Sequence, residues 1–181
     1  GKFVVYVGGA ATSRMYDPNT NTWSPGPSTG AGVSLGSGSR AVQRQNGSFL
    51  ILHGGATSTT IYQPGASQNM GTTTAGPTVS GTVGAGSQVI RRSDGKIHVI
   101  HGNTSTTTSV YDPTACSTVG CTDLNGRFTA GPATTGNVVI GSFLIPRPDG
   151  KWIVGLGGGT TTNVFDPSTT PAFSAGPALS A

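Results

Sequence analysis

A motif that occurs four times constrains this chain more than any other feature. Each copy has a tight glycine-containing turn, an apolar run and then more glycine: GKFVVYVGG, NGSFLILHGG, DGKIHVIHGN and DGKWIVGLGG. The turn glycines are Gly1, Gly47, Gly95 and Gly150, at intervals of 46, 48 and 55 residues. Repetition at such a period indicates one structural unit that is stacked several times.

Further markers keep the same register in the copies. Glycines follow the apolar run, an aromatic residue stands in YDP, YQP, YDP and FDP, an arginine precedes three of the turns, and Gly-Pro closes each unit. The residues that we expect to hold the repeat are Gly8, Gly9, Gly54, Gly55, Gly102, Gly157, Gly158, Tyr16, Tyr62, Tyr111, Phe165, Arg44, Arg92 and Arg147. Agreement of several markers in four copies excludes chance.

Each unit predicts four short antiparallel strands. Asn-Gly or Asp-Gly makes the turn between the first two strands, because these residues tolerate positive φ. The second strand is the β-branched and aromatic run. The third strand ends at the Asp-Pro pair, since proline cannot continue a ladder, and the fourth lies near Trp23, Phe128 or Phe173. Four-stranded units of this length predict an all-β fold, a β-propeller built of four-stranded antiparallel blades.

The repeat divides the chain into one short unit and three complete ones. We expect a partial blade over 1–27 without its first strand, and full blades over 28–77, 78–132 and 133–181. These make fifteen strands. Proteins normally avoid leaving strand edges open. The expectation is therefore that this chain is a window of a longer protein, or that a second chain closes it.

The glycine pairs, the YDP motifs and Trp23 in YDPNTNTW resemble those of the kelch-type β-propellers, including the galactose-oxidase-like ones. The resemblance covers essentially the whole chain and is specific for fold rather than for function. It implies six or seven blades in the complete propeller, which favours the longer protein. The chain departs from the pattern where Asn103 replaces a glycine, where Gln63 replaces an aspartate and where Met70 falls near an expected aromatic.

Composition narrows the classes of function. Charged residues make up 9% of the chain, against about 25% in an average soluble domain. The net charge of +4 comes from few acids rather than from a basic cluster, so nucleic acid is not an expected partner. No apolar run is long enough for a transmembrane helix. The Gly-, Ser- and Thr-rich composition favours an extracellular or cell-surface location.

Strand connectivity sorts the loops onto two faces. One face, here the charged face, receives the loops between first and second strands and between third and fourth strands. It carries Asp94, Lys96, Asp149, Lys151, Asp17, Asp112, Asp166 and the three repeated arginines. The other, the hydroxyl face, receives the runs Thr57 to Thr60, Thr104 to Ser109 and Thr160 to Thr162.

Two histidines are candidates for a metal site. His53 and His101 hold the same position in neighbouring units, one residue before the glycine. Imidazoles on adjacent blades could share a metal ion, but no third ligand is evident. Packed or hydrogen-bonded histidines are the alternative. We find no Ser/His/Asp triad, no paired carboxylates and no phosphate loop, so no catalytic residues and no cofactor are predicted.

Three further groups have both a structural and a functional interpretation. Cys116 and Cys121 lie in an insertion and would form a small disulfide loop in an oxidising compartment. Asn46 and Asn103 stand in N-glycosylation patterns, and Asn103 is the better acceptor because Asn46 lies in a tight turn. The repeated arginines could bind an acidic ligand, but a recurring hydrogen bond to a neighbouring loop explains their repetition better.

Three functions remain open at the level of sequence. The first is a non-catalytic extracellular or cell-surface propeller that acts as a scaffold, adhesion or assembly module, with self-assembly as one option. The second is a glycan-binding propeller, with protein or glycan bound at the loops. The third is the propeller part of a secreted copper-radical oxidase whose catalytic residues lie outside this sequence, which the resemblance implies.

Overall fold

A computed structural model describes residues 2–29, 32–65, 71–115, 125–168 and 171–180. Within these ranges the chain forms fifteen strands. They are β1 (Phe3–Tyr6), β2 (Ser13–Asp17), β3 (Thr22–Pro25), β4 (Arg40–Gln43), β5 (Phe49–Leu52), β6 (Thr59–Gln63), β7 (Thr72–Ala75), β8 (Gln88–Arg91), β9 (Ile97–Ile100), β10 (Thr108–Asp112), β11 (Arg127–Ala130), β12 (Phe143–Pro146), β13 (Trp152–Gly155), β14 (Thr162–Asp166) and β15 (Ala172–Ala175).

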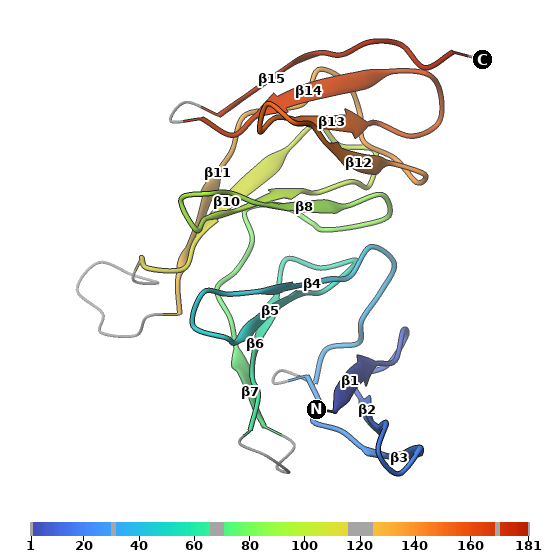
Figure 1. Ribbon diagram of the computed structural model, residues 1–181, viewed down its shortest axis with the longest axis vertical. Coiled ribbons are helices and arrows are strands. Elements are labelled where there is room, and N and C mark those ends of the chain that lie inside the picture. The colour runs from blue at the N-terminus through green and yellow to red at the C-terminus, as the bar shows by residue number, and fades with distance from the viewer. Residues whose placement is uncertain (1, 30–31, 66–70, 116–124, 169–170, 181) are drawn as a thin grey trace.

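The strands form four sheets in which sequential neighbours pair antiparallel. Their orders are β1-β2-β3, β4-β5-β6-β7, β8-β9-β10-β11 and β12-β13-β14-β15, here called blades 1 to 4. Figure 1 shows the sheets following one another from blade 1 at the N-terminus to blade 4 at the C-terminus. This arrangement confirms the all-β, β-propeller fold.

The predicted turns position the strands. Gly47, Gly95 and Gly150 have φ angles of 83°, 80° and 80°, the left-handed region that glycine adopts freely. The first strand of each complete blade ends at Gln43, Arg91 or Pro146, one residue before the repeated arginine. The arginine backbone then closes the turn; in blade 2, Arg44 N donates to Ser48 O at 2.7 Å.

The blades stack through opposite faces of their sheets. We call the face toward the preceding blade the back face and the face toward the following blade the front face. Alternation along each strand assigns the residues, so that Leu50 and Leu52 of β5 face forward while Ile97 and Val99 of β9 face back. The core between blades 2 and 3 contains Leu50, Leu52, Ile61, Val79, Val83, Ile97, Val99, Tyr111 and Phe128.

Blade 1 presents its back face to solvent. Phe3 is 60% exposed, Val5 45% and Trp23 57%. At the positions of Phe3 and Val5 in the repeat, blade 3 has Ile97 and Val99, which are buried. Both blades have the same apolar pattern in sequence. Ile97 and Val99 are buried because blade 2 packs against them, whereas no described sheet packs against Phe3 and Val5. The back face of blade 1 is therefore an apolar surface that no other described sheet covers.

Ion pairs confirm that the two predicted groups of loops share the charged face. Within a blade, the lysine after the turn glycine pairs with the aspartate that ends the third strand. The pairs are Lys2–Asp17 at 3.2 Å, Lys96–Asp112 at 2.9 Å and Lys151–Asp166 at 2.9 Å. Blade 2 has Ser48 and Gln63 at these two positions, so both partners are replaced together.

Backbone hydrogen bonds join the loops of the hydroxyl face in the same repeated way. The segment after each Gly-Pro pair returns to the loop between second and third strands. The bonds are Thr29 N to Ala11 O, Val79 N to Thr57 O, Thr134 N to Thr106 O and Leu179 N to Thr160 O, at 2.8–2.9 Å. Each blade therefore has a closed hydroxyl end, and blades 1, 3 and 4 also have an ion-paired charged end.

Candidate functional site

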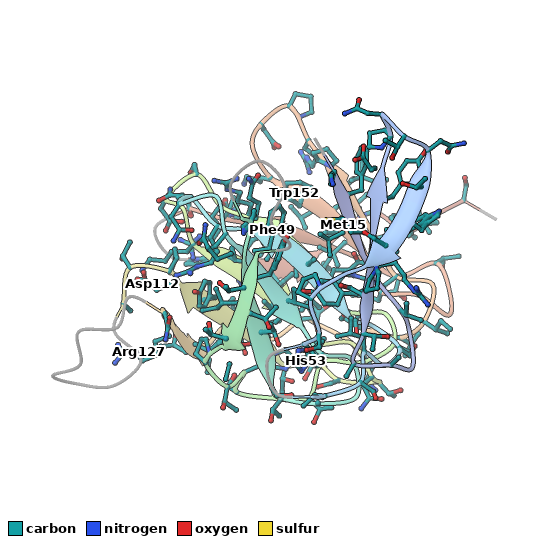
Figure 2. The ribbon with its side chains drawn as sticks, turned by 90° about the horizontal axis from the view of Figure 1, so that it is seen from below. Met15, Phe49, His53, Asp112, Arg127 and Trp152 are labelled. Atoms are coloured by element: carbon teal, nitrogen blue, oxygen red, sulfur yellow. The ribbon has the colours of Figure 1, made fainter. Side chains whose placement is uncertain are left out.

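The two candidate metal ligands lie at the hydroxyl end of blades 2 and 3. His53 follows β5, at the other end of the strand from Phe49 (Figure 2). Its Nδ1 lies 2.9 Å from Ser58 Oγ and its Nε2 2.9 Å from Thr60 Oγ1. Both ring nitrogens are therefore hydrogen-bonded, and the side chain is fully buried.

His101 has the same arrangement one blade later. Nδ1 lies 2.8 Å from Thr107 Oγ1, and Nε2 lies 2.6 Å from Ser109 Oγ. Ser109 Oγ is also 2.5 Å from Ser80 Oγ, which joins the imidazole to the segment that precedes blade 3. Burial lowers the pKa of His101 to about 4, so the ring is neutral near pH 7.

This geometry does not fit a copper or zinc centre in the described ranges. A metal-binding imidazole needs a free ring nitrogen, and hydroxyls occupy both nitrogens of His53 and His101. The same part of the chain contains no group of three or more His, Cys, Asp or Glu side chains that could hold a metal ion. The two imidazoles therefore serve as hydrogen-bonding groups that hold the hydroxyl ends of their blades.

His98 is buried without the hydrogen bonds that His53 and His101 make. It lies on the front face of β9, with its ring centroid 4.4 Å from that of Phe165 and 5.6 Å from that of Phe173. Neither ring nitrogen has a hydrogen-bond partner among the described residues. Burial, with smaller contributions from the charges of Arg92 and His101, lowers its pKa to about 3. His98 packs as a neutral ring between blades 3 and 4.

A repeated hydroxyl bond holds the end of each unit, and sequence reasoning missed it. The first residue of the third strand donates its hydroxyl to the carbonyl of the closing proline. The bonds are Ser13 to Pro27, Thr59 to Pro77, Thr108 to Pro132 and Thr162 to Pro177, at 2.5–2.8 Å. Each donor stands three residues before the repeated aromatic, a register that the sequence displays.

The same bond explains why glycine precedes every closing proline. A Cβ placed on Gly26 would lie 2.3 Å from Ser13 Oγ, and one on Gly76 would lie 2.3 Å from Thr59 Oγ1. A Cβ on Gly131 would likewise lie 2.4 Å from Thr108 Oγ1, and one on Gly176 would lie 2.4 Å from Thr162 Oγ1. Several residues of the threonine runs are therefore buried structural donors rather than parts of the hydroxyl-rich surface.

The repeated arginines connect neighbouring blades on the charged face. Arg44 Nη1 donates to Ser48 Oγ at 3.1 Å, and Nη2 donates to Pro113 O of blade 3 at 3.4 Å. Its guanidinium carbon lies 5.8 Å from the centre of the Tyr111 ring. Arg92 Nη2 approaches Ser168 O of blade 4 at 3.5 Å. Both arginines thus reach the loop that follows the third strand of the next blade.

Arg147, the last of the series, is more exposed than Arg92. Both arginines form an ion pair of 2.9 Å with the aspartate of their own turn, Arg92 with Asp94 and Arg147 with Asp149. The Arg147 side chain is 38% exposed, whereas that of Arg92 is 8% exposed. The difference follows from position, because no blade follows blade 4 in the described structure.

Three aspartates of the charged face, Asp17, Asp112 and Asp166, have lowered pKa values. Burial alone would raise the pKa of Asp112, but hydrogen bonds from Thr114 and the Lys96 ion pair lower it to about 2. The backbone amide of Asn19 lowers the pKa of Asp17, and the Lys151 ammonium lowers that of Asp166. These three aspartates act as turn formers and ion-pair partners, and none of the three is held protonated for acid–base chemistry.

The modification candidates have different surroundings. Asn46 Oδ1 accepts hydrogen bonds from Ser48 N at 3.1 Å and Ser48 Oγ at 2.6 Å, so its side chain stabilises its own turn. Asn103 is exposed and has a φ angle of 58°. Its glycosylation stays a prediction. The predicted Cys116–Cys121 disulfide lies outside the described residues.

A pocket of about 340 Å³ opens between blades 1 and 2. Aromatic and aliphatic side chains line it, with one lysine at its edge. The lining residues are Lys2, Phe3, Val4, Tyr6, Ala41, Phe49, Ile51, Tyr62 and Pro64. The hydroxyl of Tyr6 is buried and has no hydrogen-bond partner among the described residues. Sequence reasoning gave no sign of this pocket, because it depends on how two blades meet.

Comparison with known proteins adds support for the fold. No family model and no curated protein matches this chain. Among solved structures it is similar to a fungal alcohol oxidase of the AA5 family in complex with copper, with 18% sequence identity and a TM-score of 0.65. The alignment covers 97% of this chain and 37% of the oxidase chain. At this level of identity the likeness shows a shared β-propeller fold.

Proposed function

We propose that this chain forms blades of the propeller in a secreted copper-dependent alcohol oxidase, and that the copper ligands of that protein lie outside the described residues. The observation that supports the proposal is the similarity of nearly the whole chain to 37% of a copper-containing fungal alcohol oxidase. A propeller part of that size would support loops and neighbouring domains rather than perform the reaction alone.

The local chemistry agrees with a supporting role. His53 and His101 are neutral and bonded to hydroxyls, and the aspartates of the charged face are paired. The described residues form no helix long and apolar enough to cross a membrane. Low charge and the cysteine pair in the sequence favour export of the protein.

The natural full-length protein provides the test. We expect it to contain copper, measured by elemental analysis, and to form hydrogen peroxide when an alcohol is oxidised by oxygen. The 181-residue chain alone is the matched control and should do neither. A full-length protein that contains no copper and oxidises no alcohol contradicts the proposal.

A non-catalytic scaffold is the second candidate. The low charge and the Gly-, Ser- and Thr-rich composition of the sequence suggest it. Under this function the full-length protein binds protein or glycan at its loops and lacks oxidase activity. The kelch assignment and the glycan-binding alternative stay predictions.

A further inference from the structure

The turn between the first two strands of blade 2 differs in chemistry from its counterparts. Residues 44–48 read RQNGS, whereas residues 92–96 read RSDGK and residues 147–151 read RPDGK. An amide side chain, Asn46, therefore stands where the other two turns have a carboxylate. In an Asn-Gly sequence the glycine nitrogen can attack the amide carbon of the asparagine side chain, because glycine has no Cβ to hinder the approach.

The side-chain oxygen of Asn46 accepts two hydrogen bonds from one residue. Ser48 N lies 3.1 Å and Ser48 Oγ 2.6 Å from Asn46 Oδ1. Arg44 Nη1 donates to Ser48 Oγ at 3.1 Å, so the guanidinium charge strengthens the serine hydroxyl as a donor. Ser48 is fully buried and Arg44 is 6% exposed, which limits competition from water. Donors in this arrangement stabilise negative charge that develops on Oδ1.

The amide group itself is accessible to solvent. Asn46 is exposed, and a pocket of about 210 Å³ opens beside it, lined by Arg44, Gln45, Asn46, Pro113 and Thr114. Among the described residues, no atom beyond the chain neighbours of Gly47 lies within 4 Å of the place of its Cβ. Gly47 N donates to Arg44 O at 3.1 Å, a bond that an attacking nitrogen must release. The attack therefore requires movement within an exposed turn and no rearrangement of the core.

Blades 3 and 4 show where an aspartate at this position lies. Asp94 Oδ1 accepts from the backbone nitrogen two residues later at 3.1 Å, and Asn46 Oδ1 does the same at the same distance. Asp94 Oδ2 lies 2.9 Å from Arg92 Nη2. Asp149 forms this ion pair with the arginine of its own turn, also at 2.9 Å. A carboxylate in place of the Asn46 amide therefore fits the turn and meets its arginine.

We propose that Asn46 is a site of self-modification, at which the folded turn promotes deamidation to an aspartate that pairs with Arg44. The backbone N and Oγ of Ser48 stabilise the charge on Oδ1 during the attack, and Arg44 acts through the serine hydroxyl. The inference does not depend on oxidase activity, because it concerns one turn of blade 2.

The reaction needs only water and a base from the solvent. Gly47 N gives its proton to the base and forms a bond to Asn46 Cγ. The bond from Cγ to the side-chain nitrogen then breaks, and that nitrogen leaves as ammonia with a proton from the solvent. Water opens the resulting cyclic imide at Cγ, which leaves the main-chain peptide bond intact and gives a carboxylate. One water is consumed, one ammonia is released, and no group is oxidised or reduced.

The competing interpretation is that Ser48 only holds the Asn46 side chain in place and slows the reaction. The two interpretations predict opposite effects of removing the serine hydroxyl. If the hydroxyl stabilises charge on Oδ1, its removal slows deamidation. If it keeps the amide carbon away from Gly47 N, its removal accelerates deamidation.

Incubation of the 181-residue chain in heavy-oxygen water tests the proposal, with the products located by mass spectrometry of its peptides. The new carboxylate takes an oxygen from water, so only residues that react during the incubation carry the label. We expect labelled aspartate at position 46. Reaction should be slower at Asn125, the other asparagine that precedes a glycine, because Gly126 is buried and a Cβ there would lie 2.5 Å from the Tyr111 ring.

The variant Ser48→Ala gives the decisive comparison. Deamidation at Asn46 should slow about fivefold in the folded chain, as expected for the loss of one hydrogen bond. The peptides RQNGSFL and RQNGAFL, which lack the fold, are the matched controls and should react at equal rates. An unchanged or faster rate in the folded variant overturns the proposal. So does an intact Asn46 in the natural chain after Asn125 has reacted.

Two further measurements keep the test decisive if Ser48→Ala does not fold. The rate at Asn46 in the natural chain is compared with that in the peptide RQNGSFL, and a slower rate in the folded chain overturns the proposal. The variant Asn46→Asp represents the product. In urea denaturation near neutral pH we expect it to be at least as stable as the natural chain, and a loss of stability contradicts the predicted pairing with Arg44.

Discussion

Arg44 Nη2 donates to the carbonyl oxygen of Pro113 at 3.4 Å, across the boundary between blades 2 and 3. The bond joins the turn of one blade to the loop that ends the third strand of the next. Sixty-nine residues separate the two partners, so the contact forms only when both blades are in place.

Replacing Arg44 should therefore weaken the boundary. Arg44→Met removes a buried guanidinium together with its hydrogen bonds to Ser48 and Pro113 and its contact with the Tyr111 ring. We expect the free energy of unfolding to fall by about 2 kcal/mol. Arg147→Met is the matched control, because that side chain makes an exposed ion pair with Asp149, and its loss should cost about 0.5 kcal/mol or less. Urea denaturation measures both; equal losses would contradict the inter-blade role.

The hydroxyl bond at the end of each unit predicts that substitutions of its two partners are not additive in their effect on stability. Gly76→Ala places a Cβ 2.3 Å from Thr59 Oγ1 and should cost roughly 2 kcal/mol. Adding Thr59→Ala removes the clashing oxygen, so the second substitution should cost much less in the Gly76→Ala chain than in the natural one. Additive losses in this cycle would show that the two groups do not meet. Gly8→Ala, with no atom within 4 Å, is the neutral control.

His98 predicts a pH dependence with a definite sign. Its pKa in the folded protein is about 3, below the ordinary value of 6.5. As the pH falls below 6.5 the unfolded chain takes up the proton first, so stability is fully present above that pH and declines toward pH 3. The slope is about 1.4 kcal/mol per pH unit for each such histidine.

The variant His98→Leu tests this account. Leu50 occupies the same repeat position in blade 2, and leucine removes two unpartnered ring nitrogens. We expect the variant to be more stable than the natural chain at pH 5, and by less at pH 7.5. His53→Leu is the control and should destabilise at both pH values, because Ser58 and Thr60 lose their partner. A pH profile unchanged by His98→Leu would contradict the assignment.

The two asparagines predict different modification. In a secretory host, Asn103 should carry an N-linked glycan because it is exposed, while Asn46 should not because its oxygen is bonded to Ser48. Intact mass with and without Asn103→Gln measures the difference. A glycan that persists in the Asn103→Gln variant and disappears in the Asn46→Gln variant would contradict the prediction.

Much of the fold was predictable because its signals are local. Asn46-Gly47 and Asp94-Gly95 encode their own turns, and the apolar runs after them have the composition of strands. Alternation along those strands was also readable, since His98 and Val99 face opposite ways in the structure. These features depend on a few neighbouring residues, and they recur in register.

The contacts between units were harder to predict. Thr59 lies in a run of hydroxyl residues, so its special position is hidden unless it is compared with Ser13, Thr108 and Thr162. The replacement of both Lys and Asp in blade 2, by Ser48 and Gln63, is a signal of the same kind. The pocket beside β1 has no sequence signature, because Ala41 and Tyr62 meet there only through the stacking of two blades.

Residue-resolved hydrogen exchange on the 181-residue chain tests the central claim most directly, namely that the described strands form antiparallel blades that stack in sequence. The account predicts the slowest exchange in β5, β9 and β13, which have strands on both sides, and faster exchange in β7 and β11, which lie at an edge of their sheets. Protection in β7 equal to that in β5 would contradict it.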